Sequence, residues 1–137
     1  MNTTYFLKMA SGTLFGKVAT PVIPSTYYVG VSTTTPNTDG TGVTEPSGGS
    51  YARVAISNDG TSFNVPDSNG LVTNKQDLVF PESTTNWGIV TNYVIYDSLT
   101  NGNLLMYGAL TSSRSVEAIT TLIIKAGQLQ LQATNPA

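Results

Sequence analysis

The chain has 137 residues, with six Lys and Arg, eight Asp and Glu, no His and no Cys, and its formal net charge is −2. These numbers exclude a basic surface for nucleic acid, a disulfide framework, and metal or nucleophilic sites built on imidazole or thiolate. Only 10% of the residues are charged, whereas globular proteins carry about 25%, and interface centres are depleted of charge. We therefore expect an assembly protein; the alternative is a lone β-rich domain that has few charges.

The first segment, residues 3–15, predicts a short helix. Thr3 or Thr4 can cap its beginning, apolar residues recur at four-residue steps, and Gly16 suits its end. A helix of this length is marginal alone, so its large apolar side chains must pack on the protein's own sheet or on an adjacent subunit. The residues at four-residue steps are Phe6, Ala10 and Leu14, and the candidate partner contacts are Phe6, Leu7, Met9, Leu14 and Phe15.

The next two segments contrast an extended strand with a long polar connection. Residues 17–25 are expected to be extended because Pro21 and Pro24 disfavour a helix. Ser25–Ser32 is rich in β-branched and aromatic residues, which predicts the first strand. Residues 33–50 contain two prolines and a single large apolar residue, so we expect a long surface loop, a kind of segment that is generally functional or mobile.

Tyr51–Ser57 predicts the following strand, with Arg53 in its middle. We expect Arg53 to pair with a carboxylate or to lie at an edge, and a contact with another chain is the alternative. The candidate partner contacts in and beside the long loop are Asn37, Asp39, Thr41, Glu45 and Arg53.

Turn signals and short apolar runs alternate in the middle of the chain. Asn58–Gly60 and Pro66–Gly70 are expected turns on either side of a short strand over residues 62–65. One interrupted strand over residues 71–74 and 76–80 follows and is stopped by a proline.

The chain is organised around a predicted hairpin over residues 87–110. The pair Asn101-Gly102 accepts positive φ at low cost, so it turns the chain between two runs of β-branched, aromatic and aliphatic residues. Both faces of the first run are apolar, so we expect the hairpin to lie inside a two-layer structure and not on its rim. The faces that alternation predicts are Ile89, Tyr93 and Ile95 on one side and Val90, Val94 and Tyr96 on the other.

Three further segments complete the strand pattern: a weak strand at 114–118, a buried one at 121–125, and an alternating one at 128–132 with Leu inward and Gln outward. Six to nine short strands at this spacing predict an all-β fold. We expect an antiparallel β-sandwich, jelly-roll or Ig-like, with a short N-terminal helix and the long surface loop over residues 33–50.

We divide the chain into an N-terminal helix and extended arm, residues 1–24, and a β-sandwich domain, residues 25–137. No run approaches the ~20 apolar residues that span a bilayer, and the N-terminus lacks the basic and apolar regions of a secretory signal peptide. We therefore expect a protein that is made in the cytosol, without a signal peptide, an anchor of its own or membrane contact.

Carboxylates and Lys are the remaining acid or base candidates. No pair of carboxylates shares an evident pocket, although a glycosidase pair can be assembled from distant positions. Asp67–Gly70 is a poor calcium loop, because its glycine comes too early and the twelfth position is Leu78 and not Glu. The aromatic residues fall in predicted strands, where packing is favoured over stacking on sugars. We predict no catalytic residue, no metal and no cofactor.

Several stretches carry a resemblance to known proteins. They are Tyr28–Asn37, Asp39–Gly49, Tyr51–Val54, Phe80–Ser83, Trp87-Gly88, Ile95–Asp97 and Gly102–Gly108. Together they resemble a family of small bacteriophage virion structural proteins, described as tail-fibre-like or head-decoration-like. The resemblance spans about residues 25–110, and it implies a non-enzymatic virion component with a helix followed by a β-sandwich.

Two roles in the particle are then open, with a carbohydrate-active enzyme as a third hypothesis. A self-sufficient fibre needs a shaft, and the chain ends soon after its last strand, so we first expect a capsid decoration or auxiliary subunit. This subunit is a symmetric homo-oligomer, a trimer by expectation, that binds other capsid or tail proteins. The alternative is a host-binding tail-fibre or tail-tip module, in which polar groups of residues 33–50 contact glycans.

Overall fold

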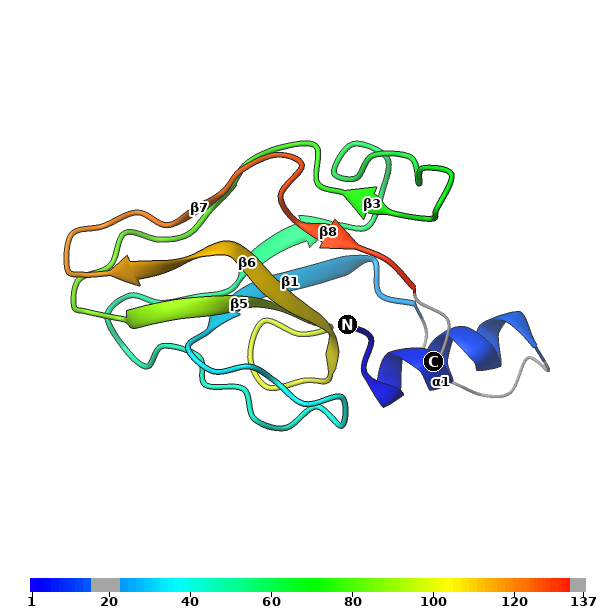
Figure 1. Cartoon of the computed structure of the whole chain (residues 1–137), viewed down its shortest axis with the longest axis horizontal. Coiled ribbons are helices and arrows are strands. Elements are labelled where there is room, and N and C mark those ends of the chain that lie inside the picture. The colour runs from blue at the N-terminus through cyan, green and yellow to red at the C-terminus, as the bar shows by residue number, and fades with distance from the viewer. Residues whose placement is uncertain (16–22, 134–137) are drawn as a thin grey trace.

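The protein folds into antiparallel β-sheets with one short helix near its N-terminus (Figure 1). The computed structural model describes residues 1–15 and 23–133. The prediction of an all-β fold is confirmed at this level, whereas the jelly-roll or Ig-like type of sandwich stays a prediction. The elements are α1 (Thr4–Leu14), β1 (Thr26–Ser32), β2 (Val54–Ser57), β3 (Val72–Thr73), β4 (Leu78–Val79), β5 (Gly88–Tyr96), β6 (Leu104–Val116), β7 (Ile123–Ile124) and β8 (Gln130–Leu131).

A four-stranded sheet in the order β2-β1-β5-β6 forms the centre, and two-stranded ladders pair β3 with β8 and β4 with β7. The expectation that the hairpin avoids the rim is right for β5 but wrong for β6, which is an edge strand. The N-terminal residues cover part of this edge, because the Thr3 N–H donates to the Leu105 carbonyl at 3.0 Å and the Tyr107 N–H donates to the Met1 carbonyl at 3.0 Å. The apolar start of β6 is therefore protected without a further strand.

The main core lies between the four-stranded sheet and the two ladders. Val29 and Val31 from β1 and Val90 from β5 have no exposed surface, and they belong to one cluster with Phe80 and Leu129, which lie next to β4 and β8. Burial of apolar surface contributes roughly 25 cal/mol per Å². This face of the sheet is therefore the main source of stability.

The opposite face of the sheet carries a smaller apolar cluster. Val43 packs against it from residues 33–53, a segment without helix or strand that joins β1 to β2. Because this segment covers the second face, residues 92–96 of β5 are buried on both sides, as their apolar sequence predicts. The cluster consists of Val94, Tyr96, Leu104 and Tyr107.

One face of β5 differs from the predicted alternation. Val90 packs with Tyr93 and Ile95 in the main core, whereas Ile89 is exposed. The register between β5 and β6 shifts between Val90 and Asn92, and such an irregularity changes which side chains share a face. The prediction that Ile89 lies beside Tyr93 is therefore wrong.

The turn of the β5–β6 hairpin lies at the predicted dipeptide. Asn101 and Gly102 have φ values of 53° and 79°, in the left-handed region that this pair accepts. The Asp97 carboxylate closes the loop, because it accepts hydrogen bonds from the backbone N–H and the side-chain amide of Asn103 at 2.7 and 3.0 Å. The predicted turn is confirmed.

Two strands before the hairpin are shorter than predicted. The strand expected at residues 51–57 begins at Val54, because the preceding residues leave β1 and turn their side chains toward other contacts. The strand expected at residues 62–65 is reduced to a single bridge between Phe63 and Asn74. A proline at position 66 prevents further pairing there.

The strands at the two ends of the second layer are divided differently from the prediction. The interrupted strand becomes β3 and β4, which pair with different partners. The separate strand expected at residues 114–118 is wrong, because β6 continues across the register shift to Val116. The two last strands lie within their predicted ranges. The predicted alternation is confirmed for Leu129, which is buried, and Gln130, which is exposed, whereas Leu131 and Gln132 are both half-buried.

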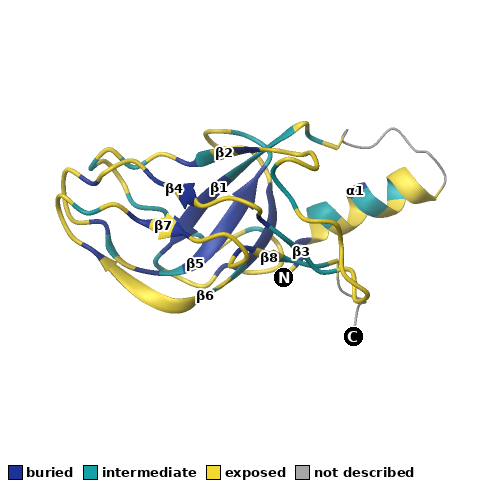
Figure 2. Cartoon of the chain, turned by 90° about the horizontal axis from the view of Figure 1, so that it is seen from above, coloured by how far each residue is buried: buried dark blue, intermediate teal, exposed yellow. Residues whose placement is uncertain are grey.

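α1 begins as predicted and is tied to β6 at its first turn. Thr3 caps it, because the Thr3 hydroxyl oxygen accepts a hydrogen bond from the Phe6 N–H at 3.2 Å and donates one to the Leu104 carbonyl at 2.6 Å. The predicted apolar stripe does not face the domain as a whole, since Met9 is buried but Leu14 is 72% exposed. Figure 2 shows the reason: α1 extends away from the sheets.

Gly16 and most of the predicted extended segment over residues 17–25 lie outside the described residues. Within the described ranges, no helix has the length and apolar content needed to cross a membrane.

Asn101→Pro is expected to destabilise the protein, because the proline ring fixes φ near −65° and cannot adopt the observed 53°. We expect the free energy of unfolding to fall by about 1–3 kcal/mol, measured by urea denaturation. Asn101→Gly is the matched control and should stay close to the native protein. An unchanged melting temperature for the proline variant would contradict the turn.

Gly108→Ala is also expected to be destabilising. An added Cβ would collide with the ring and hydroxyl of Tyr93 on the neighbouring strand, and the Tyr93 hydroxyl is held by a hydrogen bond to the Gln130 carbonyl at 2.7 Å. Overpacking of this kind costs about 1–3 kcal/mol. The control is Gly60→Ala, where a Cβ meets nothing within 4 Å, and equal melting temperatures for the two variants would contradict the close approach.

Candidate functional site

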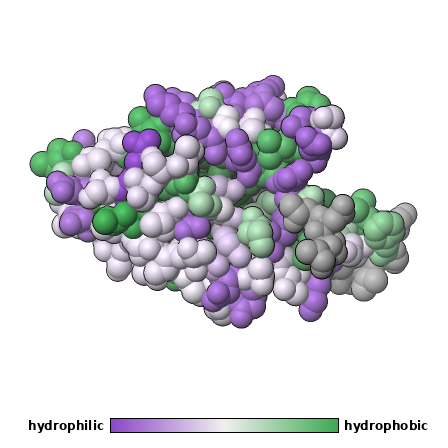
Figure 3. Space-filling model, viewed as in Figure 1, coloured by the Kyte–Doolittle hydropathy of each residue, from purple (hydrophilic) through white to green (hydrophobic). Residues whose placement is uncertain are grey.

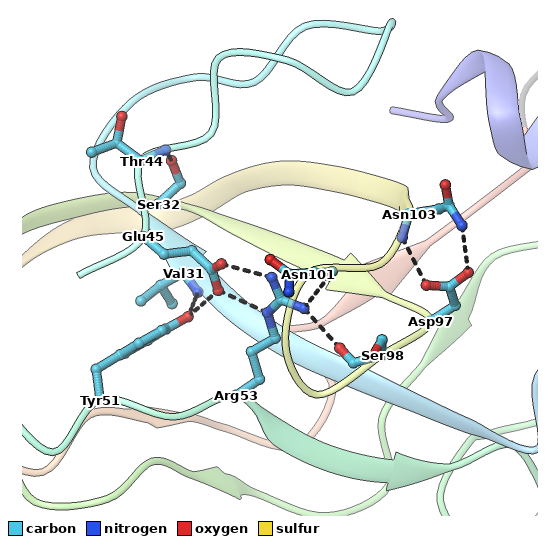
Figure 4. A network of polar contacts seen from close by, with 10 residues as sticks. All are labelled: Val31, Ser32, Thr44, Glu45, Tyr51, Arg53, Asp97, Ser98, Asn101 and Asn103. Carbon is cyan, nitrogen blue, oxygen red and sulfur yellow. Dashed lines mark hydrogen bonds and ion pairs between the residues drawn. The ribbon is translucent and has the colours of Figure 1, made fainter. Parts of the chain in front are cut away.

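A buried ion pair fixes the 33–53 segment to the hairpin turn (Figure 4). The Arg53 Nε and Nη2 atoms donate to the two Glu45 carboxylate oxygens at 2.9 and 2.8 Å. The Arg53 Nη1 atom donates to the carbonyls of Ser98 and Asn101 at 2.7 and 2.8 Å. This two-point pairing fixes orientation as well as distance, so one guanidinium joins three parts of the chain. We call this group the Arg53 latch.

Two tyrosines complete the latch. The guanidinium carbon lies 3.6 Å from the centre of the Tyr96 ring, a geometry that favours a cation–π interaction. The Tyr51 hydroxyl donates to Glu45 at 2.7 Å and accepts from the Val31 N–H at 3.0 Å. A Cβ at Gly30 would lie 2.5 Å from that hydroxyl, so the glycine in β1 is what allows the close approach.

The charges of the latch stabilise each other. Burial opposes the charge of Arg53, but the hydrogen bonds and the negative charge of Glu45 outweigh this and raise its pKa above the ordinary value. Burial, together with the hydrogen bond to Glu45 and its charge, raises the pKa of Tyr51. At neutral pH the guanidinium is therefore charged and the phenol is neutral.

The polar groups of the latch bind each other and so hold parts of the chain together. Every guanidinium nitrogen donates to a protein acceptor, and both Glu45 oxygens accept hydrogen bonds. Among the described residues, every buried polar side-chain atom has a hydrogen-bond partner, and no cluster of three or more carboxylates that could hold a metal ion occurs in those ranges. A satisfied network of this kind rigidifies the surrounding segments.

The sequence predicted part of this arrangement. The expected carboxylate partner of Arg53 is Glu45, which confirms that prediction. The roles of Tyr51 and Tyr96 were not predictable from the sequence, because aromatic residues in predicted strands usually indicate packing alone. Glu45 and Arg53 are both predicted partner contacts. Arg53 is only 9% exposed, so a partner could reach the pair only through the exposed part of Glu45, and the contact stays a prediction.

A second group of predicted contacts forms the exposed tip of the 33–50 loop. The Asp39 carboxylate accepts hydrogen bonds from the hydroxyl and backbone N–H of Thr41 at 2.6 and 2.9 Å, and these bonds lower the pKa of Asp39. The Asn37 side-chain amide donates to the Thr41 hydroxyl at 3.1 Å. The tip is tied to the first turn of α1, because the Thr4 N–H donates to the Thr38 carbonyl at 2.9 Å.

The third group lies on α1. Met9 is buried within the protein, and Phe6 is half-buried. Leu7 is 38% exposed, Leu14 72% and Phe15 75%, and Figure 3 shows hydrophobic surface at this end of the molecule. The domain therefore leaves the outer part of the helix for another contact, which stays a prediction.

An apolar groove lies beside α1, and Phe6 of the helix is part of its lining. Its volume is about 530 Å³, and the side chains that line it are mostly apolar. Its walls come from α1, β1, the connection after β2 together with β3, β5, β6, and β8 with the residues after it. These parts are distant in sequence, so no local pattern could have predicted the groove. Its large apolar side chains include Phe6, Phe63, Val65, Met106 and Leu131.

Glu45→Ala is expected to lower the free energy of unfolding by about 3 kcal/mol, because it leaves the buried Arg53 charge without its partner. Chemical denaturation measures this loss. The matched control is Glu82→Ala, which removes an exposed carboxylate that takes no part in the latch. Equal stability of the two variants would contradict the structural importance of the latch.

Comparison with protein families matches residues 3–132 to the family described as Podophage GP4 fiber I protein gp80. No curated protein matches the chain. The family match includes α1 and all eight strands of the described structure. It confirms the resemblance to small phage virion proteins and indicates a structural role in the virion. The chain belongs to this family of podophage fibre proteins.

Proposed function

We propose that this protein is a non-enzymatic structural subunit of the phage fibre, which joins other virion proteins through α1 and the tip of the 33–50 loop. Family membership over residues 3–132 is the observation that supports the proposal most directly. The fibre description of the family is the reason to prefer this role to capsid decoration.

The surface of the protein also supports an assembly role. Only 10% of the residues are charged, so contacts with other chains require little dehydration of charge. The apolar end of α1 is exposed, and Phe15 with 75% exposure is the clearest case. A protein that works alone would gain nothing from this exposure.

The latch argues for a structural role and against a reaction centre. Its donors and acceptors are already paired with each other, and Arg53 is buried. A reaction centre needs groups that are free to exchange protons or bonds with a substrate. In our proposal the latch instead holds the loop tip and the start of α1 in fixed positions.

We also propose that the N-terminal segment, residues 1–24, contributes the attachment and that the β domain, residues 25–137, forms the body of the subunit. The polar tip of the loop, with Asn37, Asp39 and Thr41, is available for a contact with a neighbouring virion protein. A host glycan is the other ligand that such neutral and acidic polar groups could bind.

Antibody labelling of purified virions tests the proposal. Gold-labelled antibody against the recombinant protein should decorate the tail region of the phage that encodes it, in electron micrographs. Virions from which the gene has been deleted are the control and should carry no label. Label distributed over the faces of the capsid would contradict the fibre role and favour decoration.

Binding of the recombinant protein to host cells separates a scaffold from a receptor-binding module. The triple variant Asn37→Ala, Asp39→Ala and Thr41→Ala changes the loop tip and leaves the latch intact. We expect the native protein and this variant to bind cells equally weakly. Specific cell binding that is lost only in the variant would overturn the scaffold role of the loop tip.

A further inference from the structure

We infer that two copies of this protein form a reciprocal dimer, in which the apolar end of each α1 lies in the groove of the other copy. The inference rests on the proposed function, since a structural subunit must join other chains. It commits to a second copy of this chain as the occupant of the groove.

The apolar arc of α1 is wider than its own domain covers. Successive residues of an α-helix are 100° apart, so Met9, Phe6, Ala10, Leu14 and Leu7 follow one another around an arc of about 160°. A helix that packs on one surface typically buries an arc of about 100° or more. Met9 and Phe6 use one side of the arc inside the protein, and Leu14 and Leu7 on the other side are exposed.

The groove supplies the concave counterpart of this helix end. Phe63, Met106 and Leu131 lie in its wall, and Val65 in its lining is 86% exposed. Its volume of about 530 Å³ lies in the range of pockets that enclose large apolar groups. The same molecule therefore presents both an apolar projection and an apolar hollow of matching character.

The position of Phe6 determines how the two helices are arranged in the dimer. Phe6 belongs to the first half of α1 and also lines the groove, so the groove opens beside the base of the helix. Leu14 comes eight residues later, about 12 Å further along the helix axis. In an antiparallel pair of helices, the end of each helix lies opposite the base of its partner. Each helix end then reaches the groove of the other copy, and the two equivalent contacts form a closed two-fold dimer.

Charge selects against a foreign partner. The single charged residue of α1 is Lys8, which lies on the side of the helix opposite the apolar arc. Asp59 is the charged residue in the lining of the groove, and its carboxylate already accepts hydrogen bonds from Thr61 and Ser62. Neither the apolar arc of α1 nor the groove therefore requires a partner of opposite charge, and a second copy of this chain supplies an apolar counterpart to each.

The area required for a stable contact favours a reciprocal one. A stable interface buries about 800 Å² on each partner, whereas a single phenyl ring supplies only about 150–250 Å². One helix end in one groove is too small by this measure. Two ends, two grooves and the contact between the antiparallel helices bring the area into the required range.

Disulfide trapping between full-length copies tests the contact, and the chain contains no Cys that could interfere. Leu14→Cys and Val65→Cys are prepared as separate proteins, mixed and oxidised mildly. We expect a mixed disulfide dimer, because the contact brings these two positions together. Leu14→Cys alone should not form a disulfide with itself, since the two helix ends lie about 12 Å or more apart and a disulfide needs Cα atoms within about 7 Å.

The matched control is Ile119→Cys, a position that is 79% exposed in the connection between β6 and β7, at the opposite end of the molecule from α1 (Figure 1). Its mixture with Leu14→Cys should give no dimer. Equal trapping in all mixtures would mean random collision and would overturn the inference.

The mass of the native protein in solution gives a second readout. Light scattering should report twice the 14.4 kDa of one chain. The double variant Leu14→Ser and Phe15→Ser should be a monomer, and the control Ile119→Ser should remain a dimer. A native monomer, or the trimer expected from the sequence, would overturn the proposed two-fold dimer. Labelling of the tail by antibody would then still support the fibre role, so the two failures can be told apart.

Discussion

A sheet whose central strand is apolar on both faces has to be covered twice. In this protein two short ladders cover one face of β5, but residues 33–53, which have no regular structure, cover the other. Such a segment has no regular ladder of its own, so single backbone hydrogen bonds and side-chain bonds hold it in place. The pair of Arg53 and Glu45 is one of these side-chain bonds, and the Arg53 guanidinium also joins the segment to the hairpin turn. The cover of the second face of the core therefore depends in part on this pair.

The cost of burying a charge explains why the latch is so completely bonded. An isolated buried guanidinium is strongly unfavourable, and the attraction of its partner compensates only when the remaining donors are also satisfied. Here the carbonyls of Ser98 and Asn101 accept hydrogen bonds from Nη1, and both belong to the turn that positive φ at Asn101 makes possible. The turn and the latch thus depend on each other. Through Thr38, which bonds to Thr4, the fixed loop also sets where α1 begins.

The sequence predicts those parts of the fold that local physics determines. The cap at Thr3, the turn at Asn101 and the alternation of the last strand follow from one residue and its neighbours. The exposed Ile89 does not, because the register shift that moves Val90 into the core is a property of two paired strands. A periodic pattern in one strand contains no information about an irregularity in its ladder.

The candidate sites show the same limit. The need of Arg53 for a carboxylate is local and was predictable, whereas the stacking on Tyr96 depends on how the loop folds back over the sheet. The groove beside α1 has walls from six separate parts of the chain. Its apolar residues, such as Phe63 and Val65, look like an ordinary weak strand when they are read in order. The helix is predictable from the sequence, whereas the groove beside it forms only when these distant parts of the chain come together.

The distribution of charge gives these features a common physical meaning. The chain has few charges, and it places its best-bonded cation inside, where the pair with Glu45 organises the fold. Ion pairs on a surface are screened by salt and contribute little, while contacts between apolar or neutral groups depend only weakly on ionic strength. A subunit that uses charge to fix its own interior and uses neutral or apolar groups to meet its neighbours can keep its contacts in media of different salt content. Such a division suits a protein of a particle that must persist outside a cell.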